Sequence, residues 1–161
     1  MIRYATVEDI PRIAEILVFG KRVAYRGIFR NDDFSFNHLR VVDVMKEYQD
    51  DPQRLSGTML YDDGIVKGMI CMQSPAEHPE AVELCDFYVE PAFQGAGIGR
   101  KLIECFIREA GALGKNEIFL WVIKDNLPAR RFYERNGFSS DGEEKLIEGT
   151  PVLDKKYIRN L

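Results

Sequence analysis

The chain has 161 residues, of which 45% are hydrophobic and 30% charged, with a formal net charge of −4 and no basic cluster. Its length and composition predict one globular domain over residues 1–161, and the acidic balance argues against a nucleic-acid partner. No apolar run approaches the roughly 20 residues of a membrane helix, and residues 1–4 show no signal-peptide pattern, so we expect a cytoplasmic protein that does not bind membranes.

A short strand and a helix are expected at the start of the chain. Thr6, with Asp9 three residues later, forms the kind of polar pair that begins many helices. The apolar side chains that follow recur with helical spacing at Ile10, Ile13, Ile16 and Leu17. Residues 20–50 predict a second helical region, with a helix end at 25–29 and a turn at 31–33.

Three strands are predicted next. Residues 58–61 and 66–73 flank Asp63-Gly64, a dipeptide typical of tight hairpin turns. A loop with two prolines then leads to a third strand, Ala81–Val89.

A glycine-rich segment after this strand carries the strongest functional signal. Its seven residues are Gln94, Gly95, Ala96, Gly97, Ile98, Gly99 and Arg100. Glycines at alternate positions allow a tight turn and leave no side chains in the way. Backbone N–H groups at the start of the following helix, together with the helix dipole, favour an anion such as phosphate. The segment therefore predicts a phosphate-bearing ligand held by backbone.

Two common phosphate-binding loops do not fit this spacing. A P-loop needs Gly-Lys followed by Ser or Thr, whereas Gly99 is followed by Arg100. A dinucleotide loop counted from Gly95 or Gly97 would need its third glycine at Arg100 or Leu102. A nucleotide-binding protein of either kind is therefore nearly excluded. By itself, the segment is also compatible with a turn that only packs a helix against a sheet.

The remaining chain predicts two helices and three strands. Gly114 ends the first helix, residues 117–123 form a strand that is apolar on both faces, and Pro128 and Gly137 bound the second helix. The tail, 138–160, predicts a final pair of strands. The apolar face of the first helix is Leu102, Ile103, Phe106, Ile107, Ala110 and Leu113.

Two of these segments, in this order, resemble motifs of the GNAT N-acetyltransferase superfamily. Gln94-x-x-Gly97-x-Gly99 resembles its acetyl-CoA pyrophosphate loop, and residues 126–138 resemble its next motif, so that the resemblance covers about residues 80–140. It implies an α/β (α+β) fold of the GNAT type, with a mixed central sheet of about seven strands flanked by about four helices. The predicted element order, β-α-α-β-β-β-α-β-α-β-β, is that of this fold.

The resemblance also implies acetyl-CoA as acyl donor, with no metal. It places the cofactor on Phe87, Tyr88, Val89, Gln94, Gly95, Ala96, Gly97, Ile98, Gly99, Arg100 and Asn126. The edge of the strand Ala81–Val89 is implied to pair with the pantetheine arm, and an N–H near Tyr88 or Val89 to polarise the thioester carbonyl.

Acetyl transfer to an amine needs a base, because a free amine with a pKa of about 10.4 arrives protonated. Glu83 is the candidate, since it lies six residues before Val89 and on an alternating strand should share its face. Asp86, expected on the opposite face, ranks second. Tyr133 matches the family tyrosine that meets the cofactor sulfur and is the candidate acid. The alternatives are an exposed strand carboxylate for Glu83 and a core aromatic residue for Tyr133.

The resemblance implies transfer of the acetyl group of acetyl-CoA to a primary amine by direct attack on the thioester, and a small molecule, a protein N-terminus and a lysine all stay open as the acceptor. Arg26, Asp32 and Asp33 are expected near its pocket, and a homodimer is a superfamily-level expectation. The main alternative to an enzyme is a silent acyl-CoA-binding sensor or partner-binding module. The histidines, His38 and His78, are expected to be solvated. The cysteines, Cys71, Cys85 and Cys105, are expected to be buried and inert, with a catalytic Cys85 as the alternative.

Overall fold

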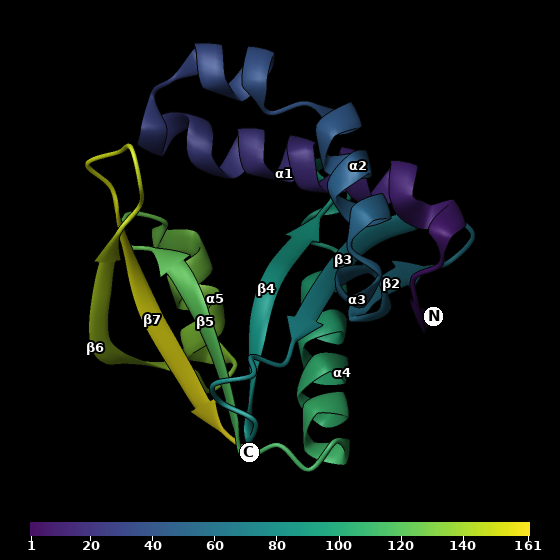
Figure 1. The fold of residues 1–161 in the computed structure, drawn as a ribbon, viewed down its shortest axis with the longest axis vertical. Helices are drawn as coiled ribbons and strands as arrows, with labels where there is room; N and C mark the ends of the chain where they lie inside the picture. The colour runs from purple at the N-terminus through teal and green to yellow at the C-terminus, as the bar shows by residue number, and fades with distance from the viewer.

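A seven-stranded sheet forms the middle of the computed structural model, which describes residues 1–161 (Figure 1). The strand order is β1-β2-β3-β4-β5-β7-β6, and all neighbours are antiparallel except β4 and β5. The strands are β1 (Ile2–Tyr4), β2 (Thr58–Asp62), β3 (Val66–Gln73), β4 (Ala81–Val89), β5 (Glu117–Ile123), β6 (Ser139–Leu146) and β7 (Leu153–Asn160). The mixed sheet and the element order confirm the predicted fold class.

Helices cover both faces of this sheet. They are α1 (Ile10–Phe29), α2 (Val41–Asp50), α3 (Pro52–Ser56), α4 (Ile98–Ala112) and α5 (Leu127–Arg135). One hydrophobic cluster of 17 buried residues joins the sheet to α4 and α5, and a second of 12 joins it to α1, α2 and α3. None of the helices is long and apolar enough to cross a membrane.

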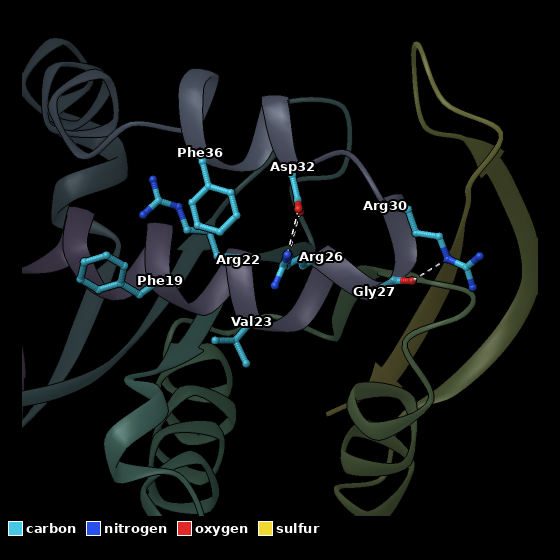
Figure 2. A pocket seen from close by; sticks show the side chains of 8 residues that line it. All are labelled: Phe19, Arg22, Val23, Arg26, Gly27, Arg30, Asp32 and Phe36. Atoms are coloured by element: carbon cyan, nitrogen blue, oxygen red, sulfur yellow. Dashed lines mark hydrogen bonds and ion pairs between the residues drawn. The ribbon is translucent and has the colours of Figure 1, made fainter.

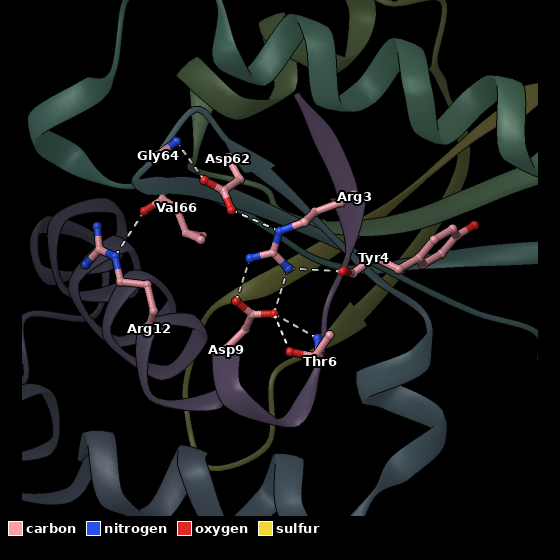
Figure 3. Close-up of polar contacts among 8 residues, drawn as sticks. All are labelled: Arg3, Tyr4, Thr6, Asp9, Arg12, Asp62, Gly64 and Val66. Carbon is pink, nitrogen blue, oxygen red and sulfur yellow. Dashed lines mark hydrogen bonds and ion pairs between the residues drawn. The ribbon is translucent and has the colours of Figure 1, made fainter.

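The polar pair predicted at Thr6 and Asp9 forms, and it belongs to a wider network (Figure 3). Asp9 accepts from the Thr6 N–H at 2.8 Å and pairs with Arg3 at 2.7 Å. Arg3 also reaches Asp62 of β2 at 2.9 Å. The hydrogen bonds from Arg3 hold the pKa of Asp9 at about 2. The start of α1 is thereby fastened to the first two strands.

Helix α1 is one continuous element up to Phe29, longer than its first apolar stripe indicated. Gly20 lies within this helix and allows Tyr88 to approach closely, because a Cβ there would lie 2.6 Å from the Tyr88 ring. The helix ends as expected at 25–29, where Arg30 takes the left-handed conformation with φ 51°. The turn expected at 31–33 is wrong in part, because Asp32 and Asp33 are already helical and continue into one wide helical turn, Phe34–His38. Of the second helical region expected at 20–50, residues 20–29 belong to α1 and residues 41–50 form α2, while α3 follows at Pro52–Ser56.

A β-bulge in β4 corrects the expected facing of its side chains. Met72 of β3 lies opposite Leu84, but the next β3 residue, Cys71, lies opposite Asp86, so Cys85 is an extra residue on β4. After the bulge, Val89 packs in the cluster with α4, whereas Tyr88 packs in the cluster with α1.

The expectation that Glu83 shares a face with Val89 is therefore wrong, because the extra residue shifts the alternation by one. The expectation that Asp86 lies on the face opposite Glu83 is wrong as well. Asp86 contacts Arg54 of α3, on the α1 side of the sheet, and its charge is felt by Glu83.

Candidate active site

The two parallel strands at the centre of the sheet separate along their length. Strands β4 and β5 pair only at Ala81–Glu83 with Glu117–Phe119, near their starts. Beyond that point they diverge, which Figure 1 shows as the opening between β4 and β5 beneath α1. The backbone edge of β4 that faces the opening has no neighbouring strand there. A ligand can therefore enter the sheet between these strands.

The glycine-rich segment lies at the end of β4, where α4 begins. Gly95 and Gly97 have φ of +81° and +76°, a backbone region that glycine adopts without strain. The first helical bond runs from the Lys101 N–H to the Gly97 carbonyl. No backbone N–H from Gly95 to Arg100 donates within the protein. Six consecutive donors at the positive end of a 15-residue helix make a site for a phosphate or pyrophosphate group.

The exposed edge of β4 offers one further donor at the opening. The Glu90 N–H donates to the Lys67 carbonyl of β3, and Val89 lies opposite Gly68. Hydrogen-bonded and non-bonded pairs alternate between antiparallel strands, so the Val89 N–H and C=O point away from β3 and into the opening. The Val89 carbonyl accepts from the Gln94 side chain at 3.2 Å. Of the two positions expected to polarise a carbonyl, this geometry favours Val89 over Tyr88.

Two connected hollows occupy this region. The loop cavity, about 490 Å³, lies against the glycine segment and α5, and the gap cavity, about 770 Å³, lies between β4 and β5 under α1. Six residues line both hollows and so form their common wall: Phe87, Val89, Gln94, Pro128, Ala129 and Tyr133.

Tyr133 stands on this common wall. Its ring packs between Phe132 and Phe138, with ring centroids 5.7 and 5.8 Å away. Its hydroxyl has no hydrogen-bond partner in the protein, and burial, followed by the nearby Tyr25 and Asp86, raises the pKa of the phenol above its usual value. The phenol therefore stays protonated at neutral pH and can donate to a group in either hollow.

Asn126 lies at the exit of β5 and fixes the start of α5. Its side-chain oxygen accepts from the Ala129 N–H at 3.3 Å, whereas its amide N–H₂ group has no partner within the protein, and Asn126 lines the gap cavity. Thus every residue predicted to bind the cofactor lines one of the two hollows or belongs to the glycine segment beside them.

A family model described as Acetyltransferase (GNAT) family matches residues 22–138. The chain belongs to this family. An uncharacterised N-acetyltransferase of Archaeoglobus fulgidus is 28% identical over 137 residues, covering 82% of this chain and 88% of that protein. An uncharacterised N-acetyltransferase of Methanocaldococcus jannaschii is 37% identical over 76 residues, 47% of this chain. The chain matches only 32% of the length of that protein and 38% of the spermine/spermidine N(1)-acetyltransferase of Bacillus subtilis.

Solved structures confirm the fold. The PaiA N-acetyltransferase of Thermoplasma acidophilum, crystallised with coenzyme A, superposes with a TM-score of 0.76. It covers 100% of this chain, which in turn covers 98% of it, at 20% sequence identity. The seven-stranded sheet and its divided centre are thus a GNAT fold.

The two carboxylates considered as GNAT bases differ in their surroundings. Glu83 is half-buried beside Phe119, where β4 and β5 still pair, and it does not line either hollow. Burial raises the pKa of its carboxyl group, and the nearby Lys145 opposes this shift. Asp86 does line the gap cavity, but it is bound to Arg54 at 2.6 Å. The structure therefore does not bring Glu83 together with Tyr133 in one hollow.

The residues first expected near the acceptor lie elsewhere. Arg26 and Asp32 pair at 2.7 Å across a larger hollow of about 950 Å³ between α1 and the turn Phe34–His38 (Figure 2). Asp33, also outside the gap cavity, contacts His38 at 3.1 Å. Arg22 donates to the Ser35 and Leu39 carbonyls and stacks on Phe36. The polar side chains that line this hollow already have partners. Their contacts hold the helical turn Phe34–His38 against α1.

The surroundings of the cysteines do not favour a catalytic role for Cys85. Cys71 and Cys105 are buried, as expected, and Cys85 is half-buried on the wall of the gap cavity. Burial raises the pKa of the Cys85 thiol above its usual value, and the thiol donates to Gln73 at 3.3 Å. A thiol held protonated in this way is a poor nucleophile.

Sequence reasoning missed the contribution of α1 to the gap cavity. The Tyr25 hydroxyl lies 2.8 Å from the Tyr88 hydroxyl, and both tyrosines line the gap cavity together with Tyr133. Only the continuation of α1 beyond Gly20 brings Tyr25 to this place. Tyr25 and Tyr88 are 63 residues apart in the sequence, and no local pattern pairs them.

Proposed function

We propose that this chain transfers the acetyl group of acetyl-CoA to a primary amine by direct attack of the amine on the thioester. One observation carries the proposal: the six free N–H groups of Gly95–Arg100 adjoin the opening between β4 and β5, with Tyr133 on the wall between them. Membership of the GNAT family supports it.

The donor would be held mainly by backbone. The N–H groups of residues 95–100 bind the pyrophosphate, with the dipole of α4 adding to their attraction. Arg100 and Arg135, which line the loop cavity, add positive charge beside it. The free edge of β4 hydrogen-bonds the pantetheine arm as an additional strand would. Bound acetyl-CoA supplies the activated thioester.

Three groups of the chain would serve the reaction. The Val89 N–H donates to the thioester carbonyl oxygen as negative charge develops on it. Tyr133 donates its proton to the departing sulfur, which leaves as a thiol. Glu83 accepts the proton of the incoming ammonium through one water, because its carboxylate does not line the gap cavity.

Release of free thiol from acetyl-CoA, measured with a panel of amines, tests the proposal. Tyr133→Phe should lower kcat by roughly 10²-fold and leave the Kd for CoA nearly unchanged, because the phenol acts on the leaving group. Tyr61→Phe is the matched control, since Tyr61 lies outside both hollows. Tight CoA binding with no thiol release for any amine would favour a binding module over an enzyme. An unchanged kcat in Tyr133→Phe would remove that residue from the mechanism.

A further inference from the structure

Four charged side chains line the gap cavity, and only some of them have partners. They are Lys21, Asp86, Asp125 and Asp154. Asp86 is bound to Arg54, and Asp125 is exposed in the turn after β5. Asp154 is half-buried, and its carboxylate makes no ion pair or hydrogen bond within the protein. Among the three carboxylates of this cavity, Asp154 is therefore the one that is both sheltered from solvent and free to bind a cationic ligand.

The backbone fixes Asp154 firmly. It lies on β7 between Ile123 of β5 and Lys145 of β6. Lys145, the residue opposite Asp154 on β6, places its ammonium 3.8 Å from the centre of the Trp121 ring and forms no ion pair with Asp154. Tyr25 of α1 lines the same cavity, where burial raises the pKa of its phenol and the charges of Asp86 and Asp154 add to that shift. Asp154 and the Tyr25–Tyr88 hydroxyl pair thus line the same cavity.

The rest of the cavity is apolar. Fifteen of its 23 lining residues are hydrophobic, which indicates a ligand with a hydrocarbon body. The apolar side chains on the α1 side and at the β6–β7 end include Val23, Ile28, Phe29 and Ile147. No arginine lines the cavity, and Lys21 is its single cation. A carboxylate held beside Asp154 would be repelled by it.

We propose that Asp154 binds the ammonium group of the acceptor, and that the acceptor is a primary amine on an apolar chain with no carboxylate next to the nitrogen. This inference rests on the proposed function, since it names the substrate class of the same site. Asp154 is a positioning residue here: it holds the charged amine in the gap cavity, while deprotonation and transfer belong to the groups described above.

A matched set of three small probes tests the assignment: pentylamine, pentan-1-ol and norleucine. Binding of each to the CoA-loaded protein is measured by calorimetry, which needs no turnover. The wild type should bind pentylamine at least about tenfold more tightly than pentan-1-ol or norleucine, because only pentylamine offers Asp154 a cation without an adjacent anion. Asp154→Asn should weaken pentylamine binding by about tenfold and remove its advantage over pentan-1-ol.

Asp125→Asn is the control, since this carboxylate also lines the cavity but is exposed. It should retain most of the preference for pentylamine. The proposal is overturned if the wild type shows no preference for pentylamine, or if Asp154→Asn keeps the preference while its CoA affinity and melting temperature match the wild type. A protein that binds pentylamine through Asp154 yet releases no thiol would contradict the proposed function and leave the binding assignment standing.

Discussion

Replacing Gly97 by alanine tests how the glycine segment is built. Gly97 precedes the first residue of α4 with φ 76° and ψ 5°, and a Cβ there would meet no other atom within 4 Å. The cost of the change is therefore conformational and not steric. A non-glycine residue in the left-handed region costs about 1–2 kcal/mol, which in a domain of this size lowers Tm by about 2–8 °C.

The same change should weaken CoA binding. If the backbone of Gly97→Ala relaxes to a negative φ, at least one of the six N–H groups from Gly95 to Arg100 loses its direction. A hydrogen bond to a charged group contributes about 1.5–3 kcal/mol, so we expect the Kd for CoA to rise by about 10- to 150-fold. Calorimetric titration with CoA gives the affinity, and thermal unfolding gives the stability.

Gly111→Ala is the matched control within the same helix. Gly111 has ordinary helical geometry and open space at its Cβ, so alanine there should raise stability by about 0.5–1 kcal/mol and leave the Kd for CoA unchanged. Equal CoA affinity in Gly97→Ala and Gly111→Ala would refute the role assigned to the left-handed glycine. Equal melting temperatures would refute the conformational cost.

Two further substitutions test the fold. Asp9→Asn removes the pair with Arg3; because the pKa of Asp9 falls from 3.8 to about 2, and its partner is 34% exposed, we expect a loss of about 1–2 kcal/mol at pH 7. A carboxyl group with a lowered pKa stabilises the folded state at pH values above its pKa in the unfolded chain. The difference in stability between wild type and Asp9→Asn should therefore fade between about pH 5 and pH 2 in acid titrations. A difference that does not depend on pH would contradict this reasoning. Gly57→Ala places a Cβ in steric clash with the Met72 carbonyl oxygen and should cost about 1–3 kcal/mol in denaturant unfolding, whereas the Cβ of Gly27→Ala meets no atom and should not destabilise.

Local patterns predicted much of the sheet. The bounds expected for β4 and β5, residues 81–89 and 117–123, are those of the structure. Each segment is a run of residues that favour β-strands, and turn residues flank it on both sides. The bulge at Cys85 was not predictable, since no glycine or proline marks it and it arises from how β4 pairs with β3. This single residue reversed the facing expected for Glu83 relative to Val89.

The residues of the candidate site also divide into those that the sequence predicted and those that it did not. The phosphate-binding role of Gly95–Arg100 follows from spacing, because a helix start and its free N–H groups are local features. Tyr133 could be singled out only through resemblance to the GNAT family, since by itself it reads as a core aromatic residue. Asp154 and the Tyr25–Tyr88 pair gave no sequence signal, because they meet only when α1 crosses the opening between β4 and β5.

The most direct test of the donor site is the response of backbone amides to acetyl-CoA, followed by nitrogen–proton NMR. The amides of residues 95–100 should shift most, together with that of Val89 at the edge of β4. Lys101, whose N–H already donates to the Gly97 carbonyl, should shift much less and serves as an internal control. Largest shifts around the arginines of the α1 hollow, such as Arg22, with residues 95–100 unmoved, would contradict a donor site at the start of α4.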